Sequence, residues 1–303
     1  MGTCIESVAT TSSHHRLLAR GTVGLSDEAA RVCLDRALRR PDELDLLVNA
    51  GIYKEKNMAE PALASIIQED IGANLGHPSR RGHHGTFSFD VLDGACGCLS
   101  AAYFIDAFVR DGSAKLAMIV ASDARSSGVA RGFPFDAVGG ALLLRHREGA
   151  EGFDRFEFRA FPEFAGLFRA QLRWDPDRRT TFHATGRNVL EVREEPTYAV
   201  RCVECAVVVA SSFLANAALR GDAIDLLVAS EYPPQFSSEV ARALSIAEDR
   251  VAHADPARGV AHTAGPLVAL ERATLSGRLA RARNVLFVTA GAGISVGVAL
   301  YRK

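Results

Sequence analysis

Hydrophobic residues in this chain gather in short continuous runs that follow longer segments of helical periodicity. The runs LDLLV, LAMIV, IDLLV and NVLFV show no alternation of apolar and polar residues. Continuous apolar runs of this length are typical of central strands that are covered on both faces. With helical patterns between them, the runs predict an α/β architecture.

The same order of elements occurs twice in the chain. Residues 26–51 and 203–231 each contain a helical pattern, a polar turn and a buried strand, and DELDLLV nearly matches DAIDLLV. A second helix-to-strand pair follows in each half, with Gly112 and Gly277 at equivalent helix ends. The polar, glycine-containing segment RHREGAEGFD marks the join. We expect two similar halves packed together, residues 1–148 and residues 149–303.

One region of the second half is less regular. Residues 162–197 contain the loop signals WDPDRRTT and REEPT. Two interpretations remain open, a cap over the substrate side of the molecule and a surface excursion without chemistry.

Length and charge exclude several functional classes. With 303 residues and 48% hydrophobic content, the chain can bury a large core. A formal net charge of -1 gives no indication of nucleic-acid or acidic-membrane binding. We see no apolar run of the ~20 residues that span a bilayer, and the first residues lack the pattern of a signal peptide. A cytoplasmic location is therefore expected.

The six cysteines of a chain this long are expected to be reduced thiols. Cys202 and Cys205 have the spacing of a zinc knuckle but lie in a helical pattern with no second Cys/His pair nearby, so we expect no metal. Cys96 and Cys98 cannot share one helix face, because only positions three or four apart do so. At most one of the two is expected to be reactive.

Cys96 is the candidate nucleophile. A strand-like run precedes it, Gly94 and Ala95 permit a tight turn, and LSAAYFIDAFV continues with helical spacing. A thiol at a helix N-terminus meets unpaired N–H groups and the positive end of the helix dipole, both of which favour the thiolate. The alternative is an inert buried cysteine.

Two further features complete a candidate acyl-transfer site. Superposing the two halves by Gly112 and Gly277 places Cys96 beside Ala261 and His262, and an imidazole can exchange protons near neutral pH. The turn TAGAGIS could bring backbone N–H groups to an oxyanion. A capping histidine and an ordinary tight turn are the alternatives. Together, a cysteine, a histidine and a donor turn suggest acyl transfer through a thioester.

At these residues the chain resembles the thiolase superfamily, most closely ketoacyl-ACP synthase III, where ACP is acyl carrier protein. The segments FDVLDGACGCLSAA, SAKLAMIVASDARSSG and GAGISVGVALYRK carry the likeness. The resemblance implies a five-layered αβαβα fold of two pseudo-repeated halves and a homodimer. It also implies acylation at Cys96, an oxyanion hole from the N–H groups of Cys96 and Ala292, and a substrate-binding turn with Gly291 and Gly293.

The chain departs from that family where its first catalytic histidine is expected. Ser230 and Glu231 stand there instead. His262 stands at the family's asparagine and, in HTAG, resembles the His-Thr-Leu-Gly motif of elongating synthases. Some non-decarboxylating relatives use a glutamate as base, which makes Glu231 a candidate, although a solvated loop carboxylate is the alternative.

The resemblance also bears on the acyl donor. The N-terminal segment SSHHRLLARGTVG has no counterpart of the tryptophan and arginine that grip coenzyme A in the family, and the only tryptophan is Trp174. ACP is therefore the expected donor, with coenzyme A as the alternative and no bound cofactor or metal expected. Arg242 matches a family position that contacts acidic ACP, although a surface arginine is commonly only a solvating charge.

These features predict a condensing enzyme that forms a C–C bond, in polyketide or fatty-acid-like specialised metabolism. His262 would handle protons, and Glu231 would act as base in a non-decarboxylating reaction. An O- or N-acyltransferase of the same fold and a non-catalytic partner subunit are the two alternatives.

Overall fold

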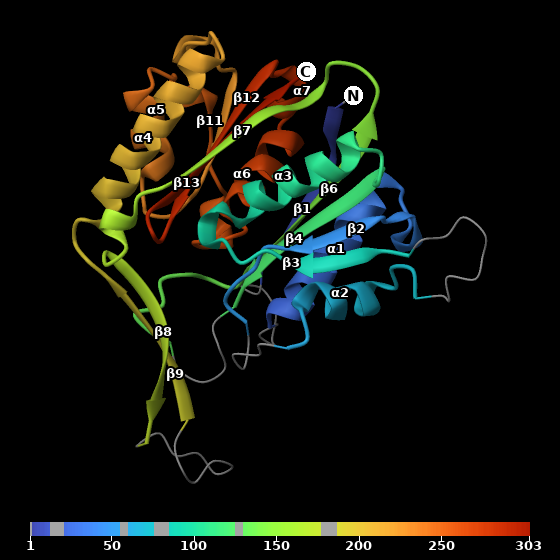
Figure 1. The fold of residues 1–303 in the computed structure, drawn as a ribbon, viewed down its shortest axis with the longest axis horizontal. Coiled ribbons are helices and arrows are strands. Elements are labelled where there is room, and N and C mark those ends of the chain that lie inside the picture. The colour runs from blue at the N-terminus through green and yellow to red at the C-terminus, as the bar shows by residue number, and fades with distance from the viewer. Residues whose placement is uncertain (1, 13–20, 55–59, 76–84, 125–129, 177–186) are drawn as a thin grey trace.

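Two five-stranded sheets and the helices around them form the body of the molecule (Figure 1). The computed structural model describes residues 2–12, 21–54, 60–75, 85–124, 130–176 and 187–303. The N-terminal segment that carries the coenzyme A argument therefore lies largely outside the described residues, at residues 13–20.

The two sheets have matching strand order and direction. The first sheet is ordered β1 (Gly2–Ser12), β6 (Val138–Arg147), β4 (Leu116–Asp123), β2 (Leu46–Asn49) and β3 (Phe87–Asp90). The second is ordered β7 (Gly152–Ala160), β13 (Ser295–Arg302), β12 (Asn284–Gly291), β10 (Leu226–Ala229) and β11 (Val251–Ala252). In each sheet, the first two strand pairs in this order are antiparallel and the last two are parallel.

Helices form three layers around these sheets (Figure 1). Helices α1 (Thr22–Ala37) and α2 (Leu63–Ile71) cover the outer face of the first sheet, and α4 (Tyr198–Asn216) and α5 (Phe236–Ala243) cover the outer face of the second. Helices α3 (Gly97–Arg110) and α6 (Gly265–Leu275) lie between the sheets, and the short α7 (Arg278–Arg281) follows α6. The expected αβαβα fold is confirmed.

Burial explains why the strands carry no alternation. All residues of β2, β4 and β10 are buried, as are all but the first of β12. Three hydrophobic clusters fill the spaces between the layers, one between the sheets and one under each outer pair of helices. A strand covered on both faces needs apolar side chains in both directions, as the sequence indicated.

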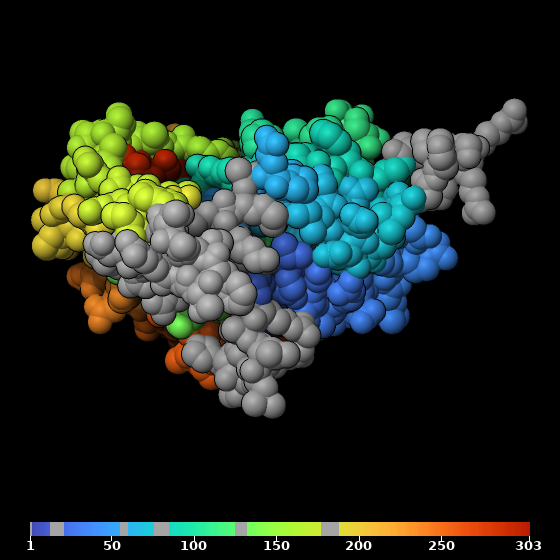
Figure 2. Space-filling view, turned by 90° about the horizontal axis from the view of Figure 1, so that it is seen from below, coloured from blue at the N-terminus to red at the C-terminus, as the bar shows by residue number. Residues whose placement is uncertain are grey.

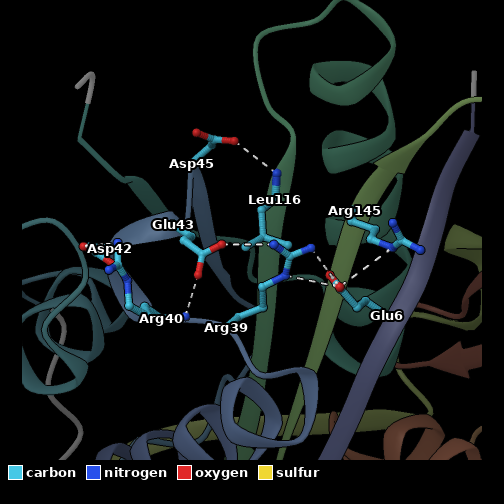
Figure 3. Close-up of polar contacts among 8 residues, drawn as sticks. All are labelled: Glu6, Arg39, Arg40, Asp42, Glu43, Asp45, Leu116 and Arg145. Carbon is cyan, nitrogen blue, oxygen red and sulfur yellow. Dashed lines mark hydrogen bonds and ion pairs between the residues drawn. The ribbon is translucent and has the colours of Figure 1, made fainter. Parts of the chain in front are cut away.

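Hydrogen bonds show the internal repeat directly. The Asp45 carboxylate accepts from the backbone N–H of Leu116 at 3.0 Å, and Asp225 accepts from Asn284 N–H at 2.9 Å. These four residues occupy the same places in the two halves, just before β2 and β10 and at the starts of β4 and β12. Figure 3 shows Asp45 beside an ion-pair network in the first half, formed by Glu6, Arg39, Arg40, Asp42, Glu43 and Arg145.

The region that looked irregular in the sequence contains a third sheet. Strands β8 (Phe168–Asp175) and β9 (Arg187–Glu194) are antiparallel, and the short β5 (Ala130–Arg131) joins β9. The pair β8–β9 projects from the body in Figure 1. In Figure 2 its yellow atoms lie on the left, on the side of the orange atoms of the second half. Most β8 side chains are exposed, including Trp174, which explains why their pattern gave no clear strand signal. Residues 177–186 lie outside the described part.

Helix α4 corrects the expectation that no apolar segment is long enough to span a bilayer. By length and composition alone Tyr198–Asn216 reaches that threshold. In this fold one face of α4 packs against β12 and β13, burying Cys202, Cys205 and Phe213.

Candidate active site

Cys96 lies where a short 3₁₀ turn, η3 (Gly94–Cys96), leads into α3. Gly94 has a φ of +51°, a left-handed conformation that a glycine adopts without strain. Gly97 lets the helix start pack closely on the first sheet, because a Cβ there would lie 3.1 Å from Ala50 O. The strand–turn–helix arrangement expected before the nucleophile is therefore present.

The Cys96 thiol is deeply buried. Its Sγ lies 3.8 Å from Thr289 O, within β12, and 3.5 Å from Ser295 O, at the start of β13. Burial raises the pKa of Cys96 to about 12. The helix N-terminus favours the thiolate, whereas desolvation of the charged form opposes it. Cys96 is a neutral thiol that must lose its proton during a reaction.

The glycine-rich turn contacts the nucleophile turn directly. A Cβ at Gly291 would lie 3.1 Å from Ala95 Cβ and 3.2 Å from Ala95 N. Ala292 is exposed at the tip of the turn, and Gly293 has a φ of +129°. The Cys96 N–H, expected as an oxyanion donor, already donates to Asp93 O at 3.0 Å within η3. Because the Cys96 N–H already has an acceptor in the 3₁₀ turn, Ala292 N–H is the stronger candidate donor.

His262 lies three residues before α6, in an almost fully buried position. Its ring packs at 4.3 Å from Phe135 and 5.2 Å from Tyr53, measured between ring centroids. The neighbouring Thr263 O accepts a hydrogen bond from Cys98 Sγ at 3.1 Å. Since Cys98 is in the first turn of α3, the histidine segment contacts the helix that begins beside Cys96.

The helix lengths correct the superposition that first linked Cys96 and His262. Helix α3 has 14 residues and α6 has 11, so aligning their ends misaligns their starts. The starts themselves, Gly97 and Gly265, are equivalent, and they place Cys96 opposite Ala264. The contact that joins the two segments is made by their neighbours, Cys98 Sγ and Thr263 O.

Asp123, which the sequence did not single out, holds the histidine segment. Its Oδ2 accepts from the Thr263 N–H at 2.9 Å and lies 3.5 Å from His262 Nδ1. Burial favours the neutral acid, but His262, Thr263 and the Tyr53 N–H outweigh it and hold the pKa of Asp123 below its usual value. The available signal was an aspartate directly after the apolar run LAMIVAS.

Ser230 and Glu231 follow β10, where the family's histidine is expected. Ser230 is 1% exposed and its Oγ accepts from Ala290 N–H at 3.3 Å, so its hydroxyl supports the strand end. Glu231 packs beside the first residue of α6, since a Cβ at Gly265 would lie 3.5 Å from its Cβ. Burial raises the pKa of Glu231, which makes its carboxylate a stronger base than an exposed one.

Arg242 lies apart from this cluster, whereas Cys98 lies beside it. Arg242 is on the outer helix α5, with an exposed guanidinium that pairs with Glu239. Cys98 is buried and bonded to Thr263 O, and burial raises the pKa of its thiol to about 12. All six cysteines are free, and the described residues contain no group of three or more metal-ligating side chains.

The structure thus places a thiol beside a glycine-rich turn and an imidazole near a carboxylate just before α6. A second carboxylate, Glu231, whose pKa is raised, packs beside the first residue of α6. A buried thiol beside a backbone turn suits nucleophilic attack on a thioester. An imidazole and a carboxylate are side chains that can act as general acid or base.

Comparison with known proteins finds similarity to ketoacyl-ACP synthase III proteins over 93% of the chain. The C-terminal domain of 3-oxoacyl-[acyl-carrier-protein] synthase III matches residues 214–303. Beta-ketoacyl-[acyl-carrier-protein] synthase III of Mesorhizobium japonicum is 29% identical over 291 residues, covering 93% of this chain and 84% of that protein. The Brucella abortus protein of the same name is 26% identical over 290 residues, with the same coverage.

Solved structures show the fold. 3-Oxoacyl-[acyl-carrier-protein] synthase III from Aquifex aeolicus superposes with a TM-score of 0.79 at 18% identity, covering all of both chains. A variant of Xanthomonas campestris OleA, solved with lauric acid and lauroyl-CoA, gives 0.80 at 13% identity and covers 100% of this chain and 99% of that one.

Proposed function

We propose that this chain, a ketoacyl-ACP synthase III-like protein of the thiolase superfamily, transfers an acyl group through a thioester on Cys96. The observation that carries the proposal is the position of Cys96: its thiol lies at the start of a buried helix, against the β12–β13 segment. Cys98, two residues further along the same helix, contacts the His262 segment through Thr263 O. Such a site suits a nucleophile shielded from water.

In the first step Cys96 Sγ attacks the carbonyl carbon of a carrier-bound thioester. A new thioester forms on Cys96, the carrier's C–S bond breaks, and the thiol proton passes to the departing carrier sulfur through His262. Ala292 N–H would stabilise the oxyanion of the tetrahedral intermediate. The high pKa of Cys96 requires this coupled proton transfer, because the free thiol is neutral at pH 7.

In the second step the acyl group passes to a carbon nucleophile: a C–C bond forms, the C–S bond to Cys96 breaks, and the Cys96 sulfur regains a proton equivalent to the one removed from the acceptor carbon. Ser230 offers no imidazole for assisting decarboxylation, whereas Glu231 is a partly buried carboxylate of raised pKa. We infer a non-decarboxylating condensation in which Glu231 removes the proton next to the acceptor carbonyl. Specialised metabolism of polyketide or fatty-acid type suits this altered set of residues.

A specific observation favours a second candidate acceptor. The pairing of His262 with Asp123 suits removal of a proton from a hydroxyl or amine, as in other Cys–His–Asp sites. The product would then be an ester or amide. Product masses after incubation with a malonyl carrier, or with hydroxylated and amino acceptors, distinguish the two reactions.

ACP is the proposed acyl donor, and a homodimer in the cytoplasm is the proposed state. The curated relatives carry ACP in their names, and Arg242 is an exposed cation that could meet an acidic carrier. Its pairing with Glu239 reduces its availability, so we expect Arg242→Ala to raise the KM for the carrier only about two- to fivefold.

Intact mass spectrometry tests the thioester. Incubation with acyl-ACP is expected to add one acyl mass to the wild type and none to Cys96→Ala. Cys98→Ala is the matched control, since it removes an equally buried thiol two residues away and is expected to keep the adduct. Absence of an adduct on the wild type with carriers of several acyl lengths contradicts the proposal and favours a non-catalytic partner subunit.

A further inference from the structure

Asp123 is held rigidly at the end of β4. Its Oδ1 accepts from the backbone N–H groups of Ile52 at 3.0 Å and Tyr53 at 2.8 Å. Its Oδ2 accepts from both the N–H and the hydroxyl of Thr263. The side chain is 2% exposed. Four donors from two segments therefore fix the carboxylate in one orientation, and they favour its ionised form.

The His262 ring is equally confined. It is 8% exposed and lies between Phe135 and Tyr53, which restricts its rotation. Its Nδ1 is buried and has no hydrogen-bond partner among the described residues, while Asp123 Oδ2 lies 3.5 Å away. A contraction of about 0.5 Å would complete an ordinary N–H···O bond. Hydrogen bonds of this kind are commonly long in sites without substrate.

The chemistry of the pair determines the tautomer. An ionised carboxylate only accepts hydrogen bonds, so the ring nitrogen that faces it must carry the proton. A neutral imidazole has one N–H, which leaves the lone pair on the other nitrogen. With Nδ1 protonated toward Asp123, Nε2 is the atom that can take a proton.

We propose that Asp123 is a positioning residue that holds His262 as the Nδ1–H tautomer and so directs Nε2 toward the reacting groups. The consequence for turnover rests on the proposed acyl transfer, whereas the tautomer itself does not. The competing explanation is structural: Asp123 would only fasten Thr263 to the first half, with no influence on the imidazole.

NMR of the wild type with ¹⁵N-labelled histidine distinguishes these explanations without any variant of Asp123. Cross-peaks between the ring nitrogens and ring protons report the tautomer, and a His262→Gln sample identifies the signals. We expect the Nδ1–H form for neutral His262. A predominant Nε2–H form overturns the proposal even if every variant fails to fold.

Asp123→Asn tests the consequence. The amide can donate to Nδ1, which would force the Nε2–H tautomer and remove the acceptor. We expect the transfer step, measured in single turnover from preformed acyl-enzyme, to slow about 10³- to 10⁴-fold. Thr263→Val removes a hydroxyl donor from the same carboxylate and is expected to keep the Nδ1–H tautomer and lose less than about tenfold.

Asp225→Asn is the matched control outside the site, since that carboxylate also accepts from two backbone N–H groups. We expect it to leave transfer unchanged. If the wild type is acylated but Asp123→Asn keeps both tautomer and rate, the positioning role fails and the proposed function stands. If no carrier acylates the wild type, the proposed function fails and the tautomer measurement still decides the role of Asp123.

Discussion

Two equivalent contacts between the halves are of different kinds, one made by close packing and the other by hydrogen bonds. The last residues of β4 and β12 are Asp123 and Gly291, and each contacts the turn before the central helix of the other half. Gly291 meets Ala95 through close backbone packing, whereas Asp123 binds Thr263 through hydrogen bonds. The same place in a duplicated scaffold thus serves a thiol in one half and an imidazole in the other.

The ends of β2 and β10 show a second difference of this kind. Gly51 follows β2, and a Cβ there would lie 2.2 Å from Ser122 O, so only glycine fits. Its equivalent after β10 is Glu231, beside the start of α6. Each half therefore has one carboxylate and one glycine at these strand ends, in exchanged positions. We infer that the repeat supplies the framework and that the differences between the halves supply the acid–base chemistry.

Replacing Glu231, the carboxylate of the second half, is expected to have the largest effect on activity. Glu231→Gln keeps the shape and removes the base, so C–C bond formation should fall about 10²- to 10⁴-fold while Cys96 acylation continues. Product formation and acyl-enzyme formation are measured separately by mass spectrometry. Ester or amide formation that survives at the wild-type rate would assign the base role to His262 alone.

Glu231→Gln is also expected to change how the stability of the folded chain depends on pH. Because burial raises the Glu231 pKa in the folded state, the folded chain holds a proton that the unfolded chain releases above about pH 4.3. Wild-type stability should therefore decline relative to Glu231→Gln as pH rises from below that value through the raised pKa. Urea unfolding at acidic and neutral pH measures the difference, and a constant difference would contradict the burial argument.

Gly291→Ala tests the contact on the thiol side. The new methyl group would lie 3.1 Å from Ala95 Cβ, with no flexible side chain to yield. We expect a loss of about 1–3 kcal/mol in unfolding free energy and about 10²-fold slower acylation, because the turn moves away from Cys96. Gly166→Ala is the control, since its methyl group would meet only Arg169 Nη2 at 3.7 Å. Normal acylation in Gly291→Ala would show that the glycine-rich turn takes no part in the acylation of Cys96.

The smallest effect on stability is expected for substitutions at a turn where both halves have the same arginine–aspartate pair. Arg40 pairs with Asp42 and Arg220 pairs with Asp222 at equivalent turns, and both arginines are highly exposed. Arg40→Ala and Arg220→Ala should each change the unfolding free energy by less than about 1 kcal/mol. A clearly larger loss in one variant, measured by urea unfolding, would show that the repeat is not energetically symmetric there.

Local signals in the sequence determined the framework. Continuous apolar runs indicated strands covered on both faces, because such strands have no solvent side on which polar residues could alternate. Glycines at helix ends were equally clear, and Gly112 and Gly277 have φ values of +84° and +71°. The exposed pair β8–β9 gave no such signal, since its side chains meet little core.

Contacts between distant residues decided the site. Sequence spacing identified Cys96 but could not show that its burial keeps the thiol neutral, or that η3 already uses its N–H. Asp123 and His262 lie far apart in the chain and meet only when the halves pack. The sequence by itself determined the repeat and the candidate thiol, because periodicity and turn chemistry are local. Only the tertiary structure decided which carboxylate faces the imidazole, because that choice depends on how two sheets and their connecting turns pack together.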